Sequence, residues 1–132
     1  MRDLSRLVRV RKIWEKQARI QLGQATQELN EAERATVSAL DDHRRSQETD
    51  GDILIRRIAG MATHDKYTAA ELVRRQAEHR TRAAQGSWRR SAQDLDASEK
   101  LEERRKQALA YLARRSSEAT LDELMAMRRR KR

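Results

Sequence analysis

Between residues 18 and 39, small and apolar side chains recur at alternating steps of four and three. This spacing is the seven-residue repeat of a coiled coil, in which a narrow stripe of one helix packs against another helix. We expect the helix that carries the stripe to run from about residue 4 to about residue 48. The stripe consists of Ala18, Leu22, Ala25, Leu29, Ala32, Thr36 and Ala39.

The composition of the chain also favours long helices. Charged residues make up 39% and hydrophobic residues 37% of the sequence, and phenylalanine is absent, which is too little apolar volume for a compact globule. Low hydrophobicity and a net charge of +9 would also suit a disordered chain. However, the 132 residues contain no proline and only four glycines, and strong helix formers dominate. We therefore expect solvent-exposed helices that bury one narrow stripe.

The middle of the sequence predicts a turn. Asp50-Gly51-Asp52 and Gly60 are turn signals, so residues 49–66 are interpreted as a turn region that holds at most one short helix. A short apolar patch lies inside it, made of Ile53, Leu54, Ile55, Ile58 and Met61.

A second helix is expected over residues 67–118. Thr68 and Glu71 have the spacing of a capping box, which marks a helix start. The apolar stripe of this helix is poorer, and Ser87, Ser91 and Ser98 are predicted to interrupt it. Thr120 and Glu123 repeat the capping spacing, so the basic tail, residues 119–132, is either a separate short helix or a continuation.

Two helices joined by a short turn run antiparallel. The predicted fold class is therefore all-α, a long antiparallel two-helix coiled-coil hairpin, and the chain forms a single domain over residues 1–132. With the turn centred near residue 56, Ala25 is expected near Trp88, Leu4 near Leu109 and Gly23 near Gly86.

Charge gathers toward the two ends of the sequence. Residues 1–20 contain seven basic and two acidic side chains, and residues 99–132 contain eleven and six. The hairpin would place these two segments side by side and would create one strongly positive end. The remainder of the chain is close to neutral.

No catalytic or metal-binding pattern is present. His43, His64 and His79 are scattered, and Asp41-Asp42-His43 are neighbours that do not share a helix face. No glycine-rich phosphate loop, cysteine, secretory signal or membrane-length apolar run occurs. We expect a cytoplasmic protein that is not an enzyme and binds no metal or cofactor.

The positive end leaves three functional interpretations open beside a simple solvated helix face. A nucleic-acid partner would use the basic run 128–132, but no aromatic residues interleave the arginines for base stacking. A membrane surface would need a bulky apolar face, which residues 1–20 offer only in part. A protein partner with an acidic socket explains why positive charge gathers at one end.

Two stretches resemble the FliJ family of flagellar type III export proteins. LSRLVRVRKIWEKQARIQLGQATQELNEAE resembles the first helix of that family, and EKLEERRKQALAYLARRSSEATLDELMAMRRR resembles its last helix. The YscO group of injectisomes shares this architecture, so the choice between flagellar and injectisome systems stays open. The resemblance implies a cytoplasmic stalk that is peripheral to the plasma membrane through the export apparatus. The implied partners are a hexameric export ATPase, the cytosolic domain of the export gate and export chaperones.

The resemblance also implies particular contact residues. The end that binds the ATPase ring would comprise Arg6, Arg9, Arg11, Arg104, Arg105, Arg114, Arg115, Leu121 and Leu124. Leu4 and Leu7 would either join this end or belong to the stripe between the helices. The contact with the export gate would comprise Leu40, His43, Tyr67 and Leu72. No specific nucleic acid is expected. The alternatives are a basic coiled-coil protein that binds nucleic acid, and a structural coiled-coil dimer in which two chains form a four-helix bundle.

Overall fold

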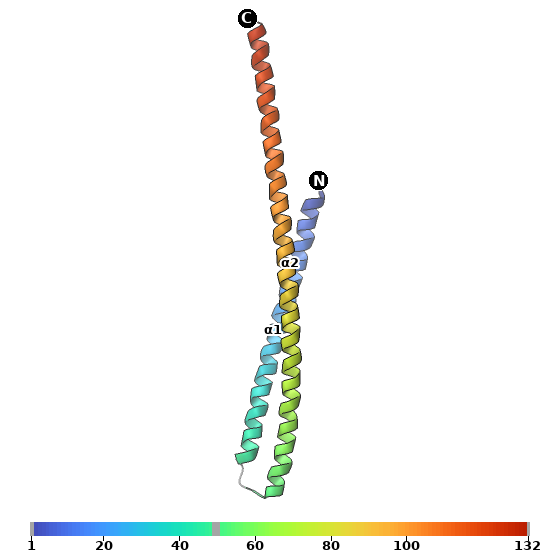
Figure 1. The fold of residues 1–132 in the computed structure, drawn as a ribbon, viewed down its shortest axis with the longest axis vertical. Coiled ribbons are helices and arrows are strands. Elements are labelled where there is room, and N and C mark those ends of the chain that lie inside the picture. Colours follow the sequence, from blue (N-terminus) through green and yellow to red (C-terminus); the bar gives the residue numbers. More distant parts are fainter. Residues whose placement is uncertain (1, 49–50, 132) are drawn as a thin grey trace. The chain divides into compact units, whose positions relative to one another are not determined.

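The structure, a computed structural model, describes residues 2–48 and 51–131. It contains two helices, α1 (Arg2–Glu48) and α2 (Ile53–Arg130), which pack against each other as an antiparallel hairpin (Figure 1). The predicted fold class is confirmed. Because no proline removes a backbone donor, α2 continues for 78 residues without a break.

The start of α2 differs from the prediction. The helix begins at Ile53, so residues 53–66 belong to it and not to a turn region. Asp52 caps the helix: its Oδ1 accepts a hydrogen bond of 3.2 Å from the Leu54 amide, and its carbonyl accepts one of 3.0 Å from the Arg56 amide. Thr68 lies inside the helix, where its hydroxyl donates to the carbonyl of His64 over 2.9 Å.

The end of α2 also differs from the expected boundary near residue 118. The basic tail continues the same helix as far as Arg130. The Thr120 hydroxyl donates to the carbonyl of Ser116, four residues earlier, over 2.9 Å. A threonine inside a helix forms this bond, whereas a capping residue would accept one from a backbone amide.

The packing of the chain forms two compact units where the sequence predicted one domain. One unit comprises Trp14–Ala92, and the other comprises Met1–Ile13 with Gln93–Arg132. Each contains a segment of α1 and a segment of α2, and each is described by itself below.

In the Trp14–Ala92 unit, α1 buries the predicted stripe. Ala18, Ala25, Ala32 and Thr36 are buried, and the two leucines and Ala39 are half-buried. From α2, Ala77 is 4% and Thr81 7% exposed, and the Thr81 hydroxyl donates to the Ala25 carbonyl over 3.1 Å. Ala25 therefore lies opposite Thr81 and not near Trp88, because α2 begins earlier than expected. Trp88 instead donates from Nε1 to the Glu15 carboxylate over 3.1 Å.

Gly23 and Gly86 do not mark a close approach of the helices. A Cβ added at Gly23 or at Gly86 would meet no atom within 4 Å. Neither glycine has a positive φ, and both lie within helices. The expected Gly23–Gly86 contact is therefore wrong.

In the other unit, the first turns of α1 lie beside the middle of α2 (Figure 1). Val8 is 5% exposed, and Ser98 is completely buried. The Ser5 hydroxyl donates to the Glu102 carboxylate over 3.2 Å, so Leu4 does not lie near Leu109, which is 44% exposed. Ser98 belongs to the buried stripe and does not interrupt it.

Candidate functional site

The candidate site lies in the unit formed by Met1–Ile13 and Gln93–Arg132, where most of the predicted ring-binding residues occur. Arg11 is the one most involved in packing. Its Nη1 donates to the carbonyl of Asp94 over 2.9 Å and to the hydroxyl of Ser98. Ser98 in turn donates to the Asp94 carbonyl over 2.8 Å. Arg11 therefore holds α1 against α2, and its guanidinium is engaged within the chain.

The remaining arginines of the paired segments are more accessible. Arg6, Arg9 and Arg104 are exposed, and Arg105 is half-buried. The structure places them in the same unit, where the first turns of α1 pack against α2. Leu4 and Leu7 are half-buried beside Val8, which supports a place in the stripe between the helices for both leucines.

Beyond these paired segments, α2 has no neighbouring helix. Within the described chain, every residue from Lys106 to Lys131 is exposed (Figure 1). We call residues 106–131 the α2 extension. Arg114 and Arg115 belong to it, and the Arg115 guanidinium lies 6.0 Å from the centroid of the Tyr111 ring, within range of a cation–π contact.

The buried stripe of α2 continues onto the extension. The stripe passes through Ser98, Glu102 and Arg105. The same steps of four and three continue to three positions that no helix covers within the described chain. These positions are Leu109, Leu112 and Ser116. Leu109, which was expected opposite Leu4, is 44% exposed, and Leu112 is 60% exposed. Helix α2 has 78 residues and α1 has only 47, so part of α2 extends past α1 and these leucines have no helix to cover them within the described chain.

Further apolar side chains follow toward the end of the extension. Leu121 and Leu124, both predicted as contact residues, are 56% and 55% exposed. Met125 and Met127 are also exposed. The extension thus carries apolar surface of the kind that helices normally bury against a partner.

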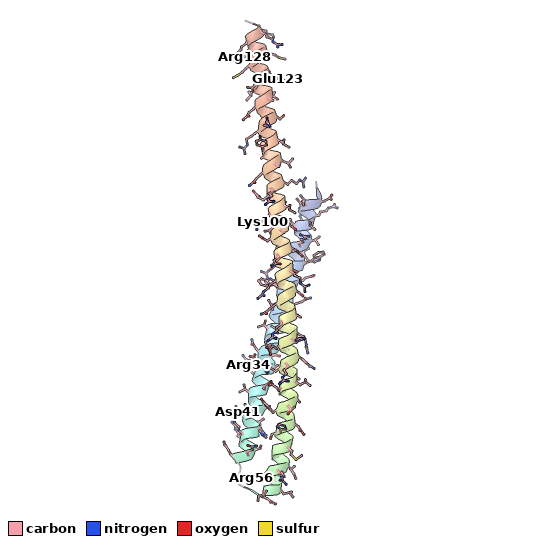
Figure 2. All side chains as sticks on the ribbon, in the orientation of Figure 1. Arg34, Asp41, Arg56, Lys100, Glu123 and Arg128 are labelled. Atoms are coloured by element: carbon pink, nitrogen blue, oxygen red, sulfur yellow. The ribbon has the colours of Figure 1, made fainter. Side chains whose placement is uncertain are left out.

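The basic residues of the extension do not lie beside the start of α1. About 35 Å of helix separates Arg105 from Arg128 at 1.5 Å per residue. The expectation of one combined positive end is therefore wrong, because the shorter turn shifts the register and α2 does not stop. The extension contains seven basic and three acidic residues, and Figure 2 shows Glu123 and Arg128 on the part of α2 that lies alone.

The predicted gate residues belong to the Trp14–Ala92 unit. Leu40, His43 and Tyr67 are half-buried, and His43 Nδ1 lies 2.9 Å from the Thr63 hydroxyl. The His43 and His64 ring centroids are 5.8 Å apart. Leu72 is 57% exposed and lines a surface hollow with Tyr67. Leu72 is therefore more accessible than the other three.

Among residues 2–48 and 51–131, no group of three or more His, Cys, Asp or Glu side chains is arranged to hold a metal ion. Across the same ranges, every buried side-chain nitrogen or oxygen has a hydrogen-bond partner. Neither helix, over its described length, has a stretch apolar enough to cross a membrane.

Comparisons with known proteins add no relative: no protein-family model, curated protein or solved structure matches this chain.

Proposed function

We propose that the chain is a non-catalytic stalk of the flagellar type III export apparatus that binds the hexameric export ATPase through the α2 extension and the adjoining start of α1. The observation that carries the proposal is the continuation of the α2 stripe past the first residues of α1, beyond which no helix covers it within the described chain. An amphipathic helix gains most of its stability from packing, so an exposed stripe of this length favours a partner.

The charge pattern favours a protein partner over a nucleic acid. Basic side chains at 114–115 and 128–131 flank the acidic residues Glu118, Asp122 and Glu123. A nucleic-acid-binding helix gains from an uninterrupted basic face, because each phosphate contact adds affinity. Mixed charges around an apolar stripe suit a protein socket, in which arginines steer association and leucines make the buried contacts.

The role of each predicted residue in this proposal follows from its accessibility. Five exposed arginines would meet acidic groups of the ring: Arg6, Arg9, Arg104, Arg114 and Arg115. Four exposed leucines would make the apolar contacts: Leu109, Leu112, Leu121 and Leu124. Arg11 would support these contacts indirectly by holding α1 in place. Leu72 would serve the export gate, and chaperone binding would accompany these contacts.

A pull-down with the purified hexameric export ATPase tests the proposal. The test variant changes Arg9, Arg104, Arg114 and Arg115, all of them exposed, to glutamate. The control makes the same change at four exposed arginines of the other unit, Arg19, Arg34, Arg44 and Arg89, so that net charge is identical. We expect the first variant to lose binding and the control to retain it.

The apolar part of the contact is tested separately. Leu109→Ser with Leu124→Ser should weaken binding, whereas Ile20→Ser with Val37→Ser should not. Failure of the unmodified chain to bind the ATPase would reject the partner. Tight binding to duplex DNA at physiological salt, with a steep salt dependence, would favour the nucleic-acid alternative instead.

A further inference from the structure

The start of α2 carries a second apolar stripe that the hairpin does not bury. Its positions follow one another at steps of three, four, three, four and three: Ile55, Ile58, Ala62, Asp65, Ala69 and Leu72. All six are exposed. At about 100° per residue, they lie on the side of α2 opposite the half-buried Thr63, Tyr67 and Ala70 that face α1.

The exposed apolar side chains here are comparable in number and exposure to those of the α2 extension. Leu54, Ile55, Ile58, Met61, Leu72 and Val73 are each between 52% and 65% exposed. Three of these six side chains belong to the stripe, and Leu54, Met61 and Val73 lie beside it; at roughly 100 Å² each, two copies of this surface would bury about 1,200 Å², the lower limit of stable interfaces. Residues 54–73 contain three basic and two acidic side chains, so the net charge is too small to attract a nucleic acid or an anionic membrane.

We infer that this stripe is a homodimer interface, in which α2 of one chain packs antiparallel against α2 of a second copy. Centred between Ala62 and Asp65, antiparallel pairing places Ile55 opposite Leu72 of the other copy and Ile58 opposite Ala69. Each layer occurs twice by symmetry, as an isologous interface requires. Large side chains meet small ones in the Ile58 layers, which suits close packing.

The charged residues favour the antiparallel direction. In this pairing Asp65 faces Ala62 of the other copy, and Lys66 follows Ala62 by one turn on the same face. Each Asp65 therefore lies next to Lys66 of the other copy, and the ion pair forms twice. A parallel pairing would place Asp65 beside Asp65, which is repulsive.

Sedimentation of the purified full chain tests the dimer without any export component, so its outcome is independent of ATPase binding through the α2 extension. The dimer would cover Leu72, so a contact of the export gate at that residue would require the monomer. We expect a dimer with a dissociation constant on the order of 10 µM or tighter. Ile58→Glu should shift the chain to monomer. Ile20→Glu is the matched control, since Ile20 is also exposed but lies alone on α1, and it should remain dimeric.

Two further experiments test the direction. Asp65→Lys should weaken the dimer, and adding Lys66→Asp to it should restore the dimer. Because the chain has no cysteine, an equimolar mixture of Ile55→Cys and Leu72→Cys chains should cross-link while neither variant alone does. A monomer at every concentration, or a dimer that Ile58→Glu leaves intact, would overturn the proposal; cross-linking of Ile55→Cys alone would show parallel pairing and overturn it as well.

Discussion

Arg11 of α1 donates a hydrogen bond from Nη1 to the backbone carbonyl of Asp94 of α2 over 2.9 Å, and the same nitrogen bonds the hydroxyl of fully buried Ser98. A residue expected to contact a partner thus holds the two segments of its own unit together. Arg11 is half-buried, so the aliphatic part of its side chain adds packing to these hydrogen bonds.

We predict that Arg11→Met destabilises this unit. Hydrogen bonds from a charged donor contribute about 1.5–3 kcal/mol, and Met retains most of the aliphatic packing. Arg9→Met is the control, since Arg9 is exposed and near in sequence. Urea denaturation followed by circular dichroism should show a lower midpoint for Arg11→Met only. Equal midpoints would mean that the Arg11 bonds add no net stability.

Enlarging the buried stripe should be costly. Ala77 is 4% exposed, so Ala77→Leu inserts three carbons between packed helices and is expected to destabilise by about 1–3 kcal/mol. Ala83, six residues later and exposed, accepts the same change within about 0.5 kcal/mol. Thermal unfolding of the two variants compares them directly. A stabilised Ala77→Leu variant would contradict the packing described.

Gly86→Ala should stabilise the chain by about 1 kcal/mol, because alanine is the better helix former and the added methyl group meets nothing within 4 Å. Gly23→Ala should behave similarly, since its surroundings are also open. The free energy of unfolding measures both. Destabilisation by either change would indicate that the helices do approach each other closely at that glycine, as the sequence predicted.

The Glu71 carboxyl should titrate below its ordinary pKa of 4.5. The hydrogen bonds from Arg74, at 2.5 and 3.1 Å, are the main cause of the lowered pKa. Because the pKa of Glu71 is lower in the folded chain than in the unfolded chain, the contact with Arg74 stabilises the fold at pH values above 4.5. This stabilisation is lost as the pH falls through the pKa of Glu71 in the folded chain. Carbon-detected NMR titration measures this pKa. Arg74→Gln should raise it, and an unchanged value would contradict the assigned cause.

The sequence alone determined the helices, their antiparallel order and the stripe from Ala18 to Ala39. These features follow from local propensity and a seven-residue period, which neighbouring residues impose whatever the distant packing is. Leu121 and Leu124 are exposed, and their role in a contact stays a prediction.

Only the tertiary structure decided where the helices meet. The sequence allows α2 to start either at a capping box at Thr68 or at an aspartate cap at Asp52. In the structure Asp52 caps the helix, so each residue of α1 faces a different residue of α2 than the sequence predicted. The register then decides that Ala25 meets Thr81, that Ser98 is buried and that residues 106–131 have no covering helix within the described chain. Register is a property of two surfaces packed together, and the small, repetitive side chains of this stripe fit several alignments almost equally well.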